Sequence, residues 1–311
     1  MGCKSCRRKQ NACKSKLHQD WSKVYGLKKD LSLKELQHDL EKREIKLGEN
    51  IVYVYVVATT EIKNNQIFQT GTGPNIEGGL ITLTNCKHKM RCEMRDDIKN
   101  GIYLNGDLWT ICEDNVWIAG LTTRNRSTNP YGKHFLFYLM KVGEYRDSFI
   151  DLWRYLQNNY PNALSVKRTV DYDPKSNPLG DVHEPRRERC CNDPFDPNSY
   201  HPPHDRHPHH WCTTYQSQPN CHTSCNVSCG CWKRDIAYNK CGNPPYLLTG
   251  DKDLSYVWQI PKIQLDLNCL IQLISQNKAV NRGFVKSQKI IRNYVILKLS
   301  DFFDCLIKSY N

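Results

Sequence analysis

The strongest constraint on the fold of this chain is a series of apolar runs between residues 51 and 153. Ile51–Ala58, Leu80–Thr84, Val116–Leu121 and Phe135–Val142 are rich in β-branched and aromatic residues, and polar, glycine-bearing connections separate them. This composition predicts strands. The first run has no polar residue to face solvent, so we expect it at the centre of a sheet.

Helical patterns flank these strands. Ser32-Leu33-Lys34-Glu35 is a capping box, followed by a leucine stripe that we expect to end near Gly48. A second helix is predicted from Phe149, with Asp147 or Ser148 as its cap. Further expected elements are a hairpin of Leu108–Cys112 with Val116–Leu121, strands at 246–249 and 256–260, and closing helices at 265–274, 286–299 and 301–308.

These elements together predict an α+β fold. We expect a mixed, mainly antiparallel sheet, either open or closed towards a small barrel, with flanking helices and a Cys/His-rich insertion. The chain of 311 residues divides into a basic N-terminal segment with a helix (1–48), the α+β part (49–261) and C-terminal helices (262–311). The insertion covers about 183–242, where prolines dominate and periodicity disappears.

The net charge of +12 lies at the two ends of the chain. Residues 1–48 carry 13 Lys and Arg against 6 Asp and Glu, and residues 262–311 carry 8 against 3, while the centre is neutral. Basic ends can neutralise phosphates, although solvated basic helices explain the same pattern. No apolar run is long enough for a membrane helix, and the N-terminus lacks the apolar region of a secretory signal.

Cysteine and histidine are concentrated in one late segment. Residues 190–241 hold eight of the sixteen cysteines, and residues 201–222 hold six of the eleven histidines. Zinc prefers thiolate and imidazole ligands, so we expect a structural zinc site, with disulfides or unligated thiols as alternatives. The expected ligands are Cys212, Cys221, Cys225, Cys229, Cys231, Cys241, His207 and His209.

The N-terminus allows three interpretations. Cys3, Cys6 and Cys13 include a CxxC pair that can bind metal, whereas Gly2-Cys3 resembles lipidated termini. Lipidation is disfavoured because the pattern asks for Ser or Thr where Cys6 stands, and an unstructured basic tail is the third interpretation. Without a secretory signal we expect a cytoplasmic or other reducing compartment, which favours thiols or metal ligands over disulfides.

A basic cluster follows the second predicted strand. Lys87, Lys89 and Arg91 share one face if this piece is extended, and Trp109 and Trp117 supply aromatic rings on neighbouring segments. Phosphate pairing and base stacking are how proteins hold single bases, so these five residues are the predicted nucleic-acid-binding residues. The alternative is a solvated loop beside core aromatics. Neither a P-loop, a dinucleotide fingerprint nor a Gly-x-Ser-x-Gly elbow occurs.

Short motifs also occur in a recognisable order over about residues 50–260. They are Tyr53-Val54-Tyr55-Val56-Val57, then Leu80–Thr84 leading to Cys86-Lys87-His88-Lys89-Met90-Arg91, Trp117-Ile118-Ala119-Gly120, Tyr138–Val142 before Phe149–Trp153, and Gly180-Asp181. This order resembles the nucleotide-modification-associated domain 2 family. Relative to that family, residues 96–112 stand as an insertion and the Asp before Trp117 is displaced to Asp114.

The resemblance implies an association with nucleic-acid base modification. The leading hypothesis is therefore a nucleic-acid or nucleotide-binding protein with a structural zinc site. Two alternatives from other classes remain: a zinc-dependent enzyme that acts on modified nucleotides with ligands from 201–241, and a non-catalytic interaction protein whose Cys/His segment is structural.

Overall fold

A computed structural model describes residues 18–170, 179–186, 193–203, 232–237, 243–286, 289–290 and 293–308. Its helices are α2 (Leu33–Lys42), α3 (His88–Asn100), α4 (Phe149–Asn159), α5 (Pro161–Lys167), α7 (Lys233–Ile236), α8 (Leu267–Ser275) and α9 (Leu299–Asp304). Short 3₁₀ turns are η1 (Trp21–Lys23), η2 (Leu47–Glu49), η3 (Glu113–Asn115) and η4 (Pro197–Ser199).

The strands fall into two groups. The main sheet contains β1 (Lys28–Lys29), β2 (Ile51–Val57), β5 (Thr82–Leu83), β8 (Val116–Thr122), β9 (Leu136–Arg146), β10 (Leu247–Val257), β12 (Ala279–Arg282) and β15 (Tyr294–Lys298). Two-stranded pairs are β3 (Thr60–Lys63) with β4 (Gln66–Gln69), β6 (Ile102–Leu104) with β7 (Asp107–Trp109), β11 (Ile263–Leu265) with β16 (Leu306–Lys308), and β13 (Val285–Lys286) with β14 (Lys289–Ile290).

The main sheet is mixed and mostly antiparallel. Its order is β1-β10-β9-β8-β2-β15-β12, and β5 pairs with β10 off this path. Only the pairs β2–β8 and β1–β10 are parallel among those described. Within the described residues the sheet is open, so the α+β prediction is confirmed in its open form.

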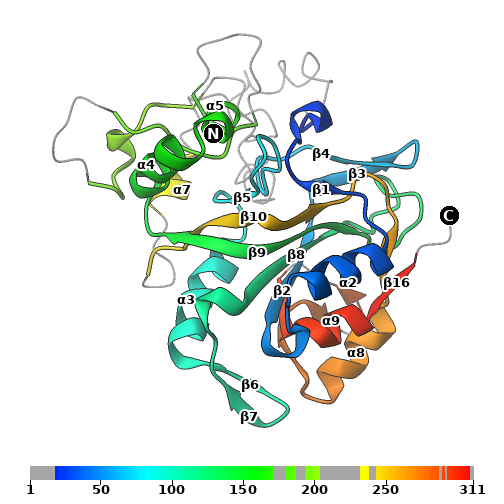
Figure 1. The fold of residues 1–311 in the computed structure, drawn as a ribbon. Coiled ribbons are helices and arrows are strands. Elements are labelled where there is room, and N and C mark those ends of the chain that lie inside the picture. The colour runs from blue at the N-terminus through cyan, green and yellow to red at the C-terminus, as the bar shows by residue number, and fades with distance from the viewer. Residues whose placement is uncertain are drawn as a thin grey trace, which may run out of the picture. The chain divides into compact units, whose positions relative to one another are not determined.

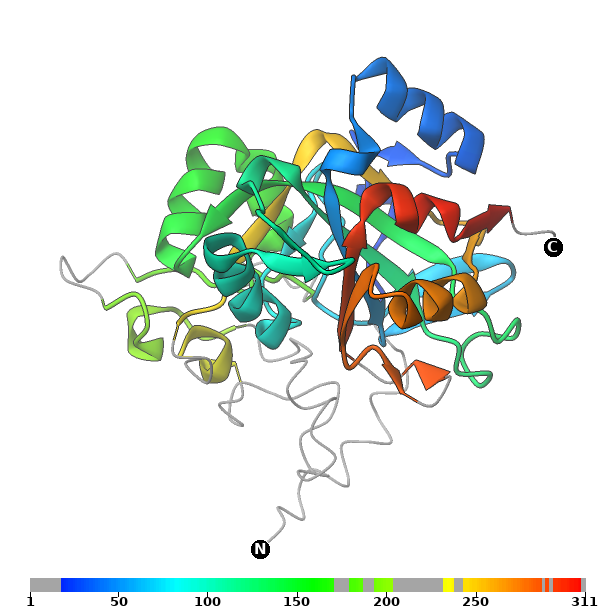
Figure 2. The ribbon, with the colours of Figure 1, turned by 90° about the horizontal axis from the view of Figure 1, so that it is seen from below.

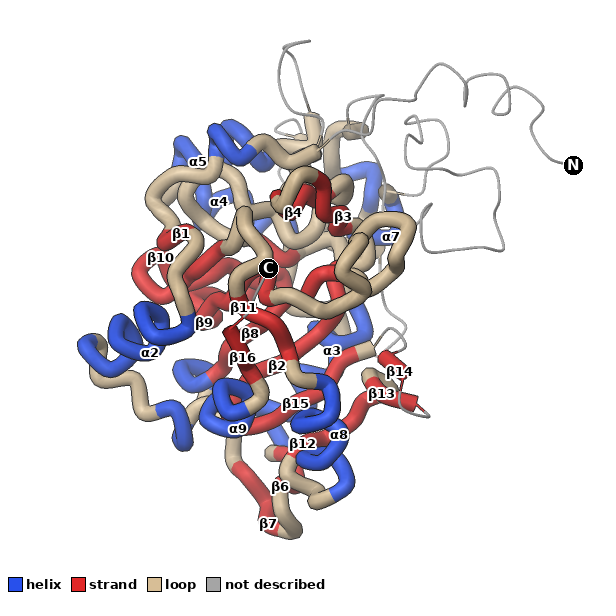
Figure 3. Tube along the Cα trace, turned by 90° about the vertical axis from the view of Figure 1, so that its right-hand side faces the viewer, coloured by secondary structure: helices blue, strands red, loops and turns tan. Residues whose placement is uncertain are grey.

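The central strand lies where its composition predicts. β2 is buried along almost its whole length and pairs in parallel with β8 and antiparallel with β15. Figure 3 shows β8, β2, β15 and β12 as successive neighbours. Gly120 in β8 allows close packing, because a Cβ at this position would come within 2.1 Å of the Tyr138 ring. The apolar first run therefore predicted the sheet centre correctly.

The described chain divides into two compact units. Unit 1 is formed from 1–26, 69–92 and 145–249, and unit 2 from 27–68, 93–144 and 250–311. Unit 2 contains β2, β8 and β15 and the helices α2, α8 and α9, of which α8 and α9 lie side by side (Figures 1 and 2). A disulfide between Cys269 and Cys305 joins these two helices. For this pair the structure differs from the expectation of free thiols.

Unit 1 is built around an aromatic and aliphatic cluster. Helix α4 begins at its predicted cap, since the Ser148 hydroxyl accepts a hydrogen bond from the Asp151 amide. Its apolar face packs with side chains from α5, α7 and the segments between them. The cluster consists of Leu80, Phe149, Ile150, Leu152, Leu156, Ala163, Leu164, Val182, Tyr200, Trp232, Ile236 and Leu247.

Two predicted elements are wrong, the hairpin and the helix 286–299, and two predicted strands are parts of one strand. Glu113–Asn115 is a 3₁₀ turn rather than a hairpin turn, because β7 pairs with β6 and Val116–Thr122 pairs with β2 and β9. The predicted strands 246–249 and 256–260 are one long strand, β10. The predicted helix 286–299 is extended at most of its described residues, since Tyr294–Lys298 pairs with β2 and β12. In the part of the chain that the structure describes, no helix has the length and apolarity needed to cross a membrane.

Candidate functional site

Two short extended segments of unit 1 bring ionisable side chains together. Arg168 and Val182 form a parallel β-bridge. The Thr169 amide donates to the carbonyl oxygen of Val182, and the Val182 amide donates to the carbonyl oxygen of Lys167. Lys167, the last residue of α5, and Asp181 precede the two bridged residues, and Thr169 and His183 follow them, so Lys167 lies beside Asp181 and Thr169 beside His183. Burial of Lys167, Asp181 and His183 is complete, which is rare for such residues in an ordinary core.

Strand β5 holds the Asp181 carboxylate. The Thr82 hydroxyl lies 2.9 Å from Asp181 Oδ1, and the Thr84 hydroxyl lies 2.8 Å from Oδ2. Burial raises the pKa of Asp181 to about 6, and nearby Lys167 and the two hydroxyls offset only part of this rise. Asp181 is thus a buried acid whose titration lies close to neutral pH.

Lys167 is held by Asn75. Its Nζ donates to the main-chain oxygen of Asn75 at 3.0 Å and to the side-chain oxygen at 2.9 Å. Burial lowers the pKa of Lys167 to about 8, while the carboxylates of Asp181 and Glu77 act in the opposite direction. The lysine and the aspartate therefore both titrate within about two pH units of neutrality.

A second set of ionisable groups adjoins the first. The Asp235 carboxylate, on α7, faces His88 Nε2 at 3.3 Å through Oδ1 and His183 Nε2 at 3.9 Å through Oδ2. All three side chains are buried. His183 Nδ1 lies 3.3 Å from the Thr169 hydroxyl. With that hydroxyl as donor, Nε2 carries the proton that faces Asp235.

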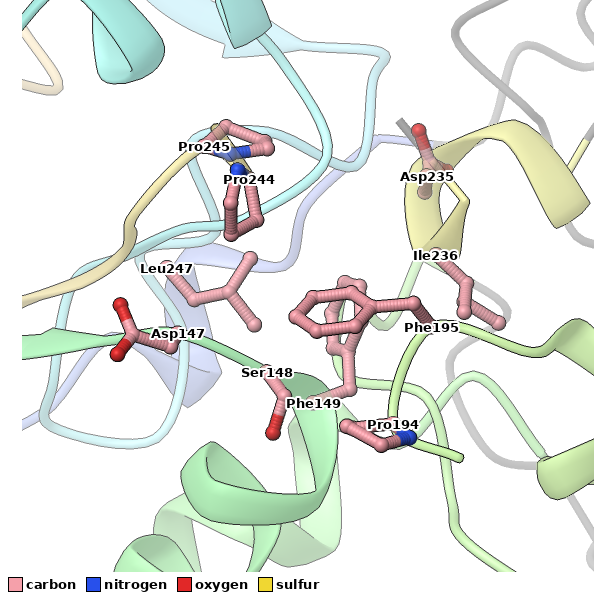
Figure 4. A pocket seen from close by; sticks show the side chains of 10 residues that line it. All are labelled: Asp147, Ser148, Phe149, Pro194, Phe195, Asp235, Ile236, Pro244, Pro245 and Leu247. Atoms are coloured by element: carbon pink, nitrogen blue, oxygen red, sulfur yellow. The ribbon is translucent and has the colours of Figure 1, made fainter. Parts of the chain in front are cut away.

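Aromatic rings surround His183, and a small pocket adjoins Asp235. The ring centroids of Phe149, Trp232 and Tyr200 lie 4.7, 5.7 and 6.5 Å from that of His183. Figure 4 shows Leu247 and the two phenylalanines in the middle of the pocket, with Asp147 and Asp235 on opposite sides. The free space of ≈ 10 Å³ accommodates one water-sized group.

The pocket and the Asp181 group share one face of β10. Thr249 lies opposite Thr82 in the antiparallel pair of β10 and β5. Leu247 lies two residues before Thr249, so its side chain points to the same side of the strand. We call the Asp181 group and the Asp235 group together the polar cluster. Its members are Thr82, Thr84, His88, Lys167, Asp181, His183 and Asp235.

The predicted basic residues have different surroundings. Helix α3 begins at His88, so the extended conformation that aligned Lys87, Lys89 and Arg91 is not present. Arg91 is fully buried, and its guanidinium donates to the main-chain oxygens of Thr84, Cys86 and Tyr246. Lys89 is exposed and Lys87 half-buried. In this structure Arg91 fixes the chain after β5 and does not face solvent.

The predicted aromatic residues belong to unit 2. Trp117 is fully buried in β8, and its Nε1 donates to the Asn50 side chain at 3.0 Å. Trp109 is half-buried, with Lys298 Nζ 4.1 Å from the centre of its ring. Trp117 is thus a core residue in this structure, whereas Trp109 keeps part of its surface accessible.

The predicted zinc ligands lie outside the described residues. These are Cys212, Cys221, Cys225, Cys229, Cys231, Cys241, His207 and His209. Within the described ranges, no group of three or more His, Cys, Asp or Glu side chains is placed to hold a metal ion. In the His88–Asp235–His183 group, the two imidazoles face different oxygens of the carboxylate.

The motifs of the resemblance contain Thr82, Thr84, His88 and Asp181 of the polar cluster. Sequence reasoning missed Lys167, His183 and Asp235, which lie in segments without periodicity. The available signal was the spacing of Asp181 and His183 two residues apart, which is typical of residues on one side of an extended chain. Searches of the chain against protein-family models, curated proteins and solved structures returned no match.

Proposed function

We propose that the protein binds a nucleotide or a nucleic-acid strand in connection with base modification, and that the buried polar cluster of unit 1 positions the segments that form the binding site. The observation that carries this proposal is the position of Asp181. Two segments quoted for the family resemblance, Leu80–Arg91 and Gly180-Asp181, come together there through the hydroxyls of Thr82 and Thr84.

The electrostatics of the cluster support a functional role. Burying ionisable groups costs free energy, and strongly shifted pKa values gather at functional sites. An acid with a pKa of about 6 beside a lysine with a pKa of about 8 can exchange protons near neutral pH.

The test is binding of a short fluorescein-labelled single-stranded DNA, followed by anisotropy, with nucleoside monophosphates as competitors. Asp181→Asn keeps the shape of the side chain and removes its charge, and we expect binding to weaken about tenfold, or about 1.4 kcal/mol. Asp97→Asn is the matched control, because Asp97 is also buried, also has a raised pKa of about 6, and belongs to unit 2.

Circular dichroism of each variant separates loss of binding from loss of fold. Thr84→Val is a milder second variant, since it removes one hydrogen bond to Asp181 at almost constant volume. Equal binding by wild type, Asp181→Asn and Thr84→Val, or failure of the wild type to bind either probe, would refute the proposed site.

The phosphate contact stays a prediction for Lys87 and Lys89, the two cations of the basic cluster that are not buried. Each phosphate of single-stranded DNA that a cation neutralises contributes about 0.7 to the slope of the logarithm of the binding constant against the logarithm of the salt concentration. Lys87→Ala with Lys89→Ala should therefore reduce that slope by about 1.4. An unchanged slope removes both residues from the interface.

A further inference from the structure

The loop that joins β8 to β9, residues 123–135, carries positive charge that nothing in the loop balances. The chain has no Asp or Glu over 115–143, whereas Arg124, Arg126 and Lys133 all fall within the β8–β9 loop. The three side chains are exposed. In the described part of the chain, no salt bridge involves any of them. Their charge therefore attracts an anionic partner.

Hydrogen bonds and packing hold this loop in one shape. The buried Asn129 side chain donates to the carbonyl oxygens of Thr123 and Lys133, at 2.6 and 2.7 Å, and so closes the base of the loop. The Arg126 side chain lies along Gly132, since a Cβ added to this glycine would come within 3.3 Å of Arg126 Nε. Arg126 thus lies close to the main chain that carries Lys133. Cations that are already positioned lose less conformational freedom when a ligand binds.

The hairpin of β3 and β4 lies beside the β8–β9 loop (Figures 1 and 2). The Ile62 amide of β3 donates to the carbonyl oxygen of Thr128 at 2.7 Å. The acidic residue of this hairpin, Glu61, is buried, and its carboxylate lies 3.0 Å from Lys63 Nζ. The hairpin therefore supports the loop without cancelling its positive charge.

An exposed tyrosine belongs to the same loop. Tyr131 exposes 36% of its surface, and its ring packs edge-on against Phe135, with the ring centroids 5.6 Å apart. Its hydroxyl donates to the Asn65 side chain, in the turn of the β3–β4 hairpin, at 3.1 Å. These contacts hold the ring while part of it stays accessible. An accessible aromatic ring among cations is how proteins bind single-stranded nucleic acids, because bases stack on the ring and cations neutralise phosphates.

We propose that the β8–β9 loop binds single-stranded nucleic acid, with Arg124, Arg126 and Lys133 at the phosphates and Tyr131 stacked on a base. A strand uses both the cations and the ring, whereas an acidic peptide uses the cations alone. This inference rests on the proposed function for the class of ligand. It adds a contact surface in unit 2, away from the polar cluster of unit 1.

The experiment measures binding of fluorescein-labelled oligothymidylate to the full chain by anisotropy, at several salt concentrations. The loop variant combines Arg124→Gln, Arg126→Gln and Lys133→Gln. Each cation lost from a phosphate of single-stranded DNA lowers the salt slope by about 0.7, so the slope should fall by about 2 in this variant. The exposed positions allow glutamine without disturbing the core, and circular dichroism checks the fold.

The matched control combines Lys34→Gln, Lys42→Gln and Lys46→Gln. It removes the same charge from exposed positions of unit 2, in α2 and the segment after it, where acidic residues alternate with the lysines. The salt slope of this variant should stay close to that of the wild type.

Two changes at Tyr131 test the stacking. Tyr131→Leu removes the ring and should weaken binding of the strand about tenfold. Tyr131→Phe keeps the ring and removes the hydroxyl that bonds to Asn65, so it should bind like the wild type. Equal loss in both variants would assign Tyr131 to the shape of the loop and overturn its contact with a base.

Two further results overturn the inference. One is a loop variant with the affinity and salt slope of the wild type. The other is equal competition by an oligoglutamate of the same charge, because the surface then binds acidic peptides as well as it binds a strand.

Calorimetry with thymidine monophosphate separates this inference from the proposed function. Binding of the monophosphate without binding of the strand leaves the proposed function standing and overturns the role of the loop. Strand binding that depends on the three cations, and not on Asp181 or Thr84, supports the loop and refutes the proposed site in unit 1.

Discussion

The hydroxyl of Thr82 lies 2.9 Å from the carboxylate of Asp181, across 99 residues of sequence. This contact ties β5 to the segment that carries both Asp181 and His183. Because the carboxylate is fully buried, each hydrogen bond that it accepts from a hydroxyl offsets part of the free-energy cost of its desolvation. The positions of the two acid–base groups of unit 1 therefore depend on one short backbone segment.

Gly180 controls that segment. A Cβ at this position would lie 1.9 Å from the carbonyl oxygen of Arg168, so Gly180→Ala must displace the chain before Asp181. We expect loss of DNA binding and a destabilisation of about 1–3 kcal/mol, typical of overpacking. Urea unfolding and anisotropy measure both effects. Gly48→Ala is the control, since no atom lies within 4 Å of its added Cβ, and equal behaviour of the two variants contradicts the prediction.

Lys167 and Asp181 should stabilise each other. Each of these buried charges acts on the other through space, without a direct salt bridge between them. Removing one leaves the other without this compensation and costs at most about 3–5 kcal/mol, the cost of breaking a direct buried pair. Lys167→Met alone should therefore be strongly destabilising, and combining it with Asp181→Asn should cost less than the sum of the two single changes. Urea unfolding of the four proteins near neutral pH gives the coupling free energy. Additive effects would show that the two charges do not interact.

The sequence predicts an element correctly where the signal for it acts between residues close together in the chain. Leu36 and Leu40 pack where the capping box of Ser32 and Glu35 starts their helix, and Ser148 caps α4, because these signals act within one helical turn. The buried run at Ile51–Val57 could only be a central strand. The α+β fold was predictable on these grounds.

Long-range pairing was not predictable from the same patterns. The sequence pattern places Val116–Leu121 in a hairpin with its sequence neighbours, but the strand β8 pairs in parallel with β2, a contact set by the sheet as a whole. Tyr294–Lys298 lies in a stretch with helical spacing, yet pairing with β2 and β12 overrides that propensity. The candidate site has the same origin, because tertiary contacts place Lys167 beside Asp181 and Asp235 beside His183.

Asp97 predicts a pH dependence of stability in unit 2. Burial raises its folded-state pKa from 3.8 to about 6, although Arg282 and the Tyr53 hydroxyl act against this rise. Between these two pH values the folded protein binds more protons than the unfolded chain, so this group's contribution to stability falls as pH increases. Asp97→Asn should lack this contribution, so the difference in the free energy of unfolding between variant and wild type should change with pH across this window. Urea midpoints measured across the window test it, and a constant difference would contradict it.

The Cys269–Cys305 disulfide predicts a redox dependence of the same unit. The bridge spans 36 residues and joins α8 to the end of α9. A cross-link that closes a loop of this length lowers the entropy of the unfolded chain and so raises its free energy by about 4 kcal/mol. Cys269→Ser should lower the free energy of unfolding by about this amount, and reduction of the wild type should reproduce the effect. Cys112→Ser is the control, since Cys112 is exposed and outside the disulfide. If dithiothreitol leaves the urea midpoint of the wild type unchanged, either the bridge does not form in solution or it does not stabilise unit 2, and intact mass under non-reducing conditions decides between these two.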